Sequence, residues 1–86
     1  MRVTVISPEG SIFDGEAESL RAPAYDGHVG ILPHHAPFMT LLGEGTLQVR
    51  TGGGERPFTV KGGFLQVVGN VVRVVAEHAT EGVHAS

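Results

Sequence analysis

The sequence contains no cysteine, no tryptophan and no excess of positive charge. The lack of cysteine excludes disulfides and thiolate metal sites, so apolar packing must hold the fold. A formal net charge of −3, with scattered lysines and arginines, argues against a nucleic-acid-binding surface. No apolar run approaches the roughly 20 residues of a membrane-spanning helix, and no signal-peptide pattern follows Met1. We therefore expect a soluble domain, or one peripheral to a larger assembly.

Glycine and proline, by contrast, are abundant, with 13 and 5 of the 86 residues. Together with frequent valine, they favour many strands joined by turns over helices. The sequence predicts an all-β fold, a two-sheet antiparallel β-sandwich of about eight to ten short strands. We expect this domain to span residues 1–78, with a polar C-terminal tail over residues 79–86. Net stability should be modest, about 4 to 13 kcal/mol for a chain of this length.

Alternation of apolar and polar residues predicts most of the strands. Strands are expected at residues 1–5, 11–15, 17–22, 29–32, 38–42, 46–50, 58–61, 64–68 and 71–75. We expect Pro23 to end the third of these, Glu44-Gly45 to turn the chain, and Gly52-Gly53-Gly54 to form a loop. The short, mainly apolar segment 38–42 is interpreted as a buried strand. Core positions predicted from the alternation are Leu47, Val49, Phe58 and Val60.

The last predicted hairpin can be followed residue by residue. Gly69-Asn70 separates two valine-rich strands, and glycine in first place suits a two-residue type II′ turn. The resulting register pairs Val68 with Val71 and makes one face wholly apolar. That face consists of Leu65, Val67, Val72 and Val74. The opposite face places Phe64, Val68, Val71 and Val75 around Gln66 and Arg73, which indicates either a contact within the domain or a surface for a partner.

Residues 27–37 carry an unusual density of special residues: two glycines, two prolines and three of the five histidines. Asp26-Gly27 is typical of a tight turn, and Gly30 within a strand pattern indicates a bulge or a closely passing backbone. Pro33 should end the strand, and Pro37 favours an extended, non-helical connection after it.

The three histidines, His28, His34 and His35, suggest a metal site that Asp26 or Glu44 could complete. His34 and His35 are adjacent, however, so in an extended chain they point to opposite faces and cannot readily bind one ion. The sequence also lacks a nucleophile elbow and a phosphate-binding loop. We therefore expect no metal, no cofactor and no catalytic residues. A metal-dependent enzyme built on the histidines is the least favoured alternative.

Residues 27–37 resemble the signature of the epsilon subunit of the F-type ATP synthase. That signature is a glycine, two variable residues, Gly-Ile, an apolar residue, Pro, then His-Ala-Pro. The positions that match it are Gly27, Gly30, Ile31, Leu32, Pro33, His35, Ala36 and Pro37. Similarity to the family continues through residues 38–45, 60–67 and 72–77, and at residues 7–9 and 13–15, so it covers nearly all of the chain.

The resemblance implies a non-catalytic rotor subunit of a proton- or sodium-translocating synthase. In the family, this N-terminal β-sandwich binds the gamma subunit and rests on the c-subunit ring, which helps to couple ion flow to ATP synthesis. The complex would place the chain peripherally on the cytoplasmic side of the bacterial inner membrane, in the F1 sector. Phe64, Val68, Val71 and Val75 are then candidate gamma contacts.

Asp26, Gly27 and His28 match the family's ring-facing loop, and we expect the corner at residues 35–37 to lie near the same end. Some relatives carry an acidic residue where this chain has His28, so we predict a polar or pH-sensitive contact there. Family members usually continue into a C-terminal helical hairpin that can inhibit ATP hydrolysis and in some binds ATP. This sequence stops at Ser86, so we expect neither hairpin inhibition nor an ATP site. The alternative function is that of a free-standing β-sandwich protein-binding module.

Overall fold

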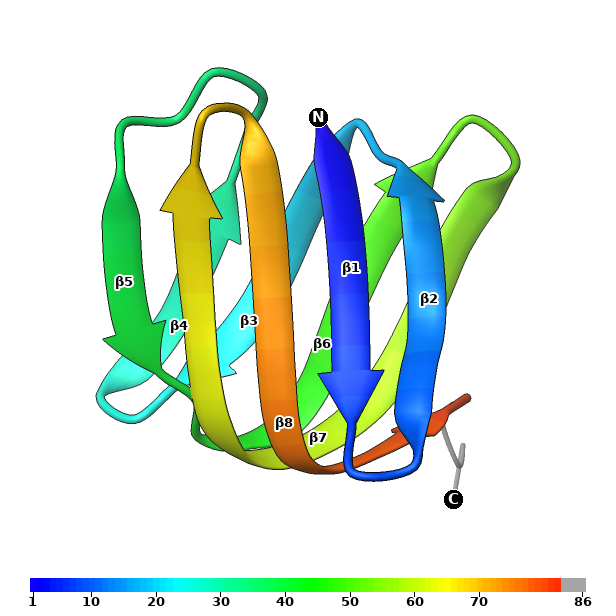
Figure 1. Cartoon of the computed structure of the whole chain (residues 1–86), viewed down its shortest axis with the longest axis vertical. Coiled ribbons are helices and arrows are strands. Elements are labelled where there is room, and N and C mark those ends of the chain that lie inside the picture. Colours follow the sequence, from blue (N-terminus) through cyan, green and yellow to red (C-terminus); the bar gives the residue numbers. More distant parts are fainter. Residues whose placement is uncertain (83–86) are drawn as a thin grey trace.

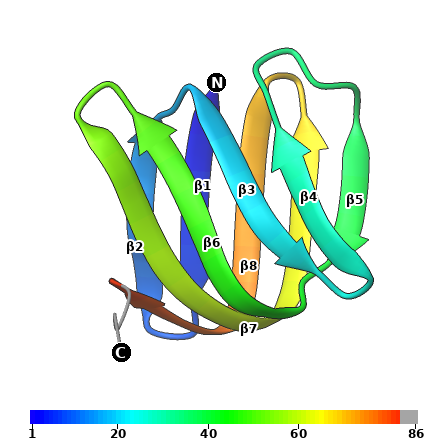
Figure 2. The same ribbon diagram turned by 180° about the vertical axis from the view of Figure 1, so that it is seen from behind.

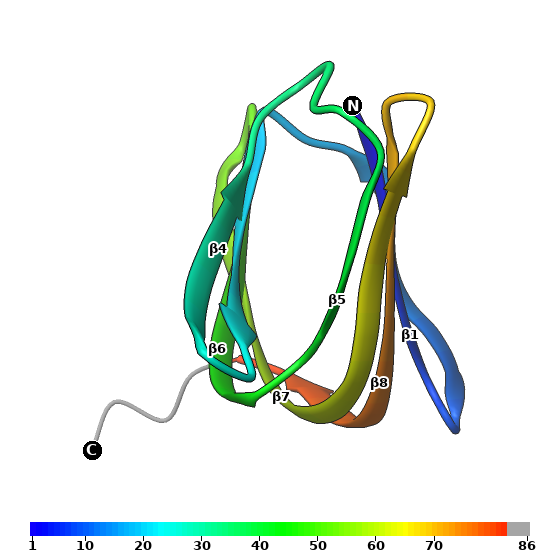
Figure 3. The same cartoon turned by 90° about the vertical axis from the view of Figure 1, so that its left-hand side faces the viewer.

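A computed structural model of the chain, which describes residues 1–82, confirms the all-β fold (Figure 1). Its strands are β1 (Arg2–Ser7), β2 (Gly10–Glu16), β3 (Ser19–Ala24), β4 (Gly27–Ile31), β5 (Phe38–Leu41), β6 (Glu44–Thr51), β7 (Gly54–Val68) and β8 (Val71–Glu81). They are hydrogen-bonded in the order β2-β1-β8-β7-β6-β3-β4, and β5 also pairs with β7. The sheet folds over on itself into two layers (Figure 3).

The two layers share strands β7 and β8, which bend and pass from one layer into the other. The first part of β7 pairs with β6, and its last part pairs with β5. Layer one therefore contains β2, β1 and β5 with the adjoining halves of β8 and β7. Layer two contains β4, β3 and β6 with the other halves, as the view from behind shows (Figure 2). We call the end where β7 bends, at Gly62-Gly63, the bent end, and the end with the Gly69-Asn70 turn the turn end.

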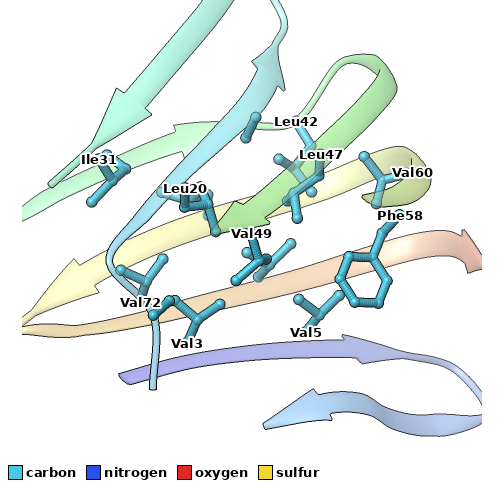
Figure 4. Close-up of a cluster of buried hydrophobic side chains, with 14 of the residues drawn as sticks. Val3, Val5, Leu20, Ile31, Leu42, Leu47, Val49, Phe58, Val60 and Val72 are labelled. Carbon is cyan, nitrogen blue, oxygen red and sulfur yellow. The ribbon is translucent and has the colours of Figure 1, made fainter. Parts of the chain in front are cut away.

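The core lies between the layers and follows the alternation of the strands (Figure 4). All four core positions predicted from the sequence are at most 1% exposed. The inward face of the last hairpin is buried as well, together with Val3 and Val5 of β1. Each such side chain contributes about 1.5 to 3 kcal/mol by leaving water.

Three strand predictions were wrong in their limits. Segments 58–61 and 64–68 are one strand, because Gly62 and Gly63 adopt φ values of 72° and 102° and let β7 bend without ending. Pro23 does not end β3 but pairs with His28 of β4. Residues 79–81, which we assigned to a tail, continue β8 and pair with β7. Residues 83–86 of the predicted tail lie outside the described residues.

The strand directions also differ in one place from a purely antiparallel sandwich. Strand β1 pairs with β2 in antiparallel and with β8 in parallel orientation. This parallel pair joins the first and the last of the described strands, so no local sequence signal marks it.

The turns agree only in part with those predicted from the sequence. The register of the last hairpin is confirmed, with Val68 opposite Val71. The φ values of Gly69 and Asn70 are 57° and 63°, however, and two positive values define a type I′ turn rather than II′. Gly52 and Gly53 form the loop between β6 and β7, as expected. The expected turn at Glu44-Gly45 is wrong, because both residues belong to β6.

Gly30 forms no bulge, and this expectation was wrong. Strand β4 pairs with β3 in an unbroken register through Gly30, and a Cβ atom there would meet nothing within 4 Å. The close backbone approach occurs instead at Gly43, where a Cβ would lie 2.7 Å from the carbonyl oxygen of Ala24.

Candidate protein-interaction surface

The outer face of layer one carries a continuous row of apolar side chains across four strands. Leu41 of β5 lies opposite Phe64 of β7, Phe64 lies opposite Val75 of β8, and Val75 lies opposite Ile6 of β1. The neighbours of these residues along their strands, such as Leu65 and Val74, are buried. Because side chains alternate between the two faces of a strand, the row points away from the core. We call Ile6, Leu41, Phe64 and Val75 the apolar row.

A second apolar group lies on the same face nearer the turn end. Val68 and Val71 are directly paired and are 55% and 38% exposed. The pair Gln66 and Arg73 separates them from the apolar row. The structure thus places all four predicted gamma contacts on one outer face, as two pairs at different levels.

Strand β5 extends this surface in a way that the sequence analysis missed. We expected a buried strand, but Met39 and Leu41 are 62% and 61% exposed. Strand β5 has four residues and pairs only with β7, and its outer face, which carries Met39 and Leu41, is open to solvent. The alternation was not visible in the sequence, because apolar residues occur at both inward and outward positions of this strand. The outward position of Ile6, by contrast, could have been predicted. Ile6 alternates with the buried Val3 and Val5 and so lies on the opposite face of β1.

The residues of the family motif divide between opposite ends of the sandwich. Strand β4 begins beside the Tyr25-Asp26 turn, at the bent end, where the amide of Tyr25 donates to the Leu41 carbonyl at 3.2 Å. The connection after β4 lies at the turn end, where the amide of His34 donates to Asn70 Oδ1 at 2.8 Å. The expectation that the corner at residues 35–37 lies near the Asp26-Gly27-His28 loop was therefore wrong.

Within the motif, Ile31 and His35 have structural roles. Ile31 is 1% exposed and belongs to the core. His35 Nδ1 lies 2.7 Å from the carbonyl oxygen of Ala36, and its ring packs edge-on against Phe38 with centroids 5.6 Å apart. His28 and His34 are exposed. Among residues 1–82, no three His, Asp or Glu side chains are grouped closely enough to hold a metal ion.

A groove of about 660 Å³ connects the loop at the bent end with the exposed strand β5. Its lining includes Tyr25, Asp26 and His28 on one side and Met39 and Leu41 on the other. Tyr25 is 70% exposed at the tip of the β3–β4 hairpin. The loop and the exposed strand β5 therefore form one continuous edge of the molecule.

The fold defines the chain as a small β-sandwich domain with an outward-facing apolar surface. Residues 1–82 contain no helix that is long and apolar enough to span a membrane. The family described as "ATP synthase, Delta/Epsilon chain, beta-sandwich domain" matches residues 1–82, and the chain belongs to this family. The resemblance found in the sequence is thereby confirmed.

Three curated relatives named "ATP synthase epsilon chain" differ in how much of their length this chain covers. The one from Leptospira borgpetersenii is 42% identical over 78 residues, which are 91% of this chain but only 61% of the relative. The chain therefore spans about three-fifths of that protein. The relatives from Caulobacter vibrioides and Frankia casuarinae are 38% and 41% identical, and 94% of each is covered.

Solved structures support the fold. A chain of the mitochondrial ATP synthase of Euglena gracilis, in an assembly described as OSCP/F1/c-ring, matches with a TM-score of 0.84 and 24% identity. The match covers 92% of this chain and 51% of that one. A chain of the Tetrahymena thermophila mitochondrial ATP synthase central stalk and c-ring matches with a TM-score of 0.78 and 18% identity, over 93% of this chain and 65% of that one.

Proposed function

We propose that the chain is a non-catalytic subunit of the central stalk of an F-type ATP synthase. It links the gamma subunit to the c-subunit ring and so supports the coupling of ion translocation to ATP synthesis. It is peripheral to the membrane, on the cytoplasmic side of a bacterial inner membrane, and is held there through the complex. The observation that carries this proposal is the exposed apolar surface of layer one on a chain of the delta/epsilon family.

The sandwich alone provides both contacts in this proposal. The relatives from Caulobacter and Frankia support this, since a chain of about this length spans 94% of each. The gamma subunit covers the apolar row together with Val68 and Val71. In this row Leu41 is exposed and the other three side chains are half-buried. Contiguous outward-facing apolar side chains that cross four strands are typical of a protein interface rather than of a free surface.

The ring contact is made by Asp26, Gly27 and His28 at the bent end. This loop closes the β3–β4 hairpin and is anchored by backbone hydrogen bonds to the β5–β6 connection, including one of 2.8 Å from the amide of Gly43 to the Pro23 carbonyl. The groove beside it connects the two proposed contacts.

Replacement of Val68 and Val71 by aspartate is expected to weaken binding of the gamma subunit by about tenfold or more, because two charges would be buried against an apolar partner. Both side chains are exposed in the free chain, so the variant should still fold, with a stability loss of about 1 kcal/mol or less because the two like charges face each other. Binding is measured by titrating the chain with the gamma subunit that is encoded next to it in the genome. Circular dichroism checks that the variant is folded. Thr80→Asp, at an exposed strand position in layer two, is the matched control. Undiminished gamma binding by the double variant would move the interface elsewhere.

His28→Ala is expected to alter assembly with the c ring, or the coupling of ion flow to synthesis, within the range pH 6 to 8. Histidine in general changes its charge in this range, and His28 is exposed at the start of β4. The measurement compares ATP-driven proton pumping of reconstituted complexes with His28 and with alanine at several pH values. His34→Ala, an exposed histidine at the opposite end, is the control. Identical pumping and assembly at every pH would exclude the contact.

A further inference from the structure

A small polar hollow lies on the outer face of layer two, away from the surface proposed to bind gamma. Its volume is about 250 Å³, and its lining consists of Arg21, His28, Thr46 and Gln48. Ligand pockets for drug-sized molecules usually measure about 300 to 1,000 Å³, so this hollow suits a smaller group. All four lining side chains carry hydrogen-bond donors.

The strand register explains why these donors converge. Arg21 of β3 is paired with Gly30 of β4 on one side and with Gln48 of β6 on the other. His28 and Thr46 lie two residues before Gly30 and Gln48, and so they share the same face. Gly30 has no side chain and faces open space, which leaves room beside the Arg21 guanidinium. The glycine that makes no bulge therefore has a role in shaping this hollow.

The charges around the hollow favour an anion. No carboxylate is part of its lining. Among the residues that the structure describes, Arg21 makes no ion pair, whereas Arg50 farther along the same face pairs with Glu55 at 3.6 Å. Glu44 is also on this face of β6 but lies opposite Lys61. A guanidinium in this setting matches the geometry of a phosphate group.

We propose that this hollow binds a phosphate-type oxyanion, either inorganic phosphate or the phosphate of a phospholipid headgroup. Arg21 supplies the charge, and His28, Thr46 and Gln48 donate hydrogen bonds to the remaining oxygens. This site goes beyond the proposed function, because binding of an anion requires neither the gamma subunit nor the c ring, although the hollow shares His28 with the proposed ring contact.

The first experiment titrates the 86-residue chain with inorganic phosphate at constant ionic strength, and follows the NMR signals of the Gly30 amide and the Arg21 side chain. We expect saturable shifts in the wild type. Arg21→Gln should weaken binding by about tenfold or more, because a hydrogen bond to a charged group is lost. Gly30→Val, which fills the hollow at a position with ordinary strand geometry, should weaken it similarly. Arg73→Gln removes the same charge from layer one and should bind as the wild type does.

The second experiment tests the lipid source by sedimentation with phosphatidylglycerol vesicles and, as a control, phosphatidylcholine vesicles. Vesicle binding that Arg21→Gln and Gly30→Val remove, without saturable binding of inorganic phosphate, would assign the site to a headgroup. Binding of inorganic phosphate that the same two variants weaken would assign it to the free anion. The proposal is overturned if neither probe binds, or if Arg73→Gln loses as much binding as Arg21→Gln.

Discussion

A Gly63→Ala variant is expected to lose about 3 kcal/mol or more of its free energy of unfolding. The φ value of Gly63 is 102°, which L side chains rarely adopt. A Cβ atom there would also lie 1.9 Å from the Val75 carbonyl oxygen and 2.8 Å from the Ala76 Cα. Both are backbone atoms of β8, so they cannot move aside without disturbing the β7–β8 pairing. Urea unfolding, followed by far-UV circular dichroism, measures the loss.

Gly30→Ala is the matched control for this substitution. Gly30 also lies within a strand, but an added Cβ would meet nothing and the backbone has no positive φ. The free energy of unfolding of the Gly30→Ala variant should change by less than about 0.5 kcal/mol, as it does for substitutions at ordinary surface positions. If both variants unfold at the same urea concentration, the bend of β7 does not depend on Gly63.

The contrast between these glycines shows what the sequence could predict about the fold. Both interrupt an apolar strand pattern, and we expected the special geometry at Gly30 and a break between two strands at Gly62-Gly63. The structure reverses this, because β7 runs through Gly63 and Gly30 lies in a regular ladder. Whether a glycine bends a strand depends on the backbone packed against it, which here is β8, and a local pattern does not contain that information.

The register of the last hairpin, by contrast, was predicted correctly. The register of the β7–β8 hairpin followed from one two-residue turn and the valines on either side, because a slip of one residue would turn the buried face outward. The continuation of β8 to Glu81 was missed for the opposite reason. Its last residues pair with the first half of β7 across the bend, so tertiary pairing rather than apolar alternation makes them a strand.

The candidate surface could be predicted in part. Phe64, Val68, Val71 and Val75 were recognised because the hairpin register left apolar residues on its second face. Strand β5 could not be recognised, since a run of apolar residues looks the same whether one face or both are covered. The separation of the family motif between the two ends of the sandwich also required the structure, because β4 spans the distance between them.

A Phe58→Ala variant is expected to lose about 3 to 5 kcal/mol of its free energy of unfolding, as large-to-small changes at buried aromatic positions do. Phe58 is 0% exposed and lies on the part of β7 that belongs to layer two. Its ring meets that of Phe13, from β2 in layer one, edge-on with centroids 5.8 Å apart. The side chain therefore joins the two layers, and its removal leaves a cavity that neither layer can close alone. Urea unfolding measures the loss.

Phe58→Leu separates the cavity from the loss of the aromatic contact, since leucine keeps most of the apolar bulk; it should cost less than the alanine variant. Because Phe58 points into the core and the apolar row points outward, Phe58→Leu should bind the gamma subunit as the wild type does while unfolding at lower urea. Val68→Asp with Val71→Asp should show the reverse, strongly weakened binding with a small loss of stability, about 1 kcal/mol or less. If Phe58→Leu weakened binding while remaining folded, the outer face of layer one would depend on how the layers are packed, and the aspartate variants alone could not define the interface.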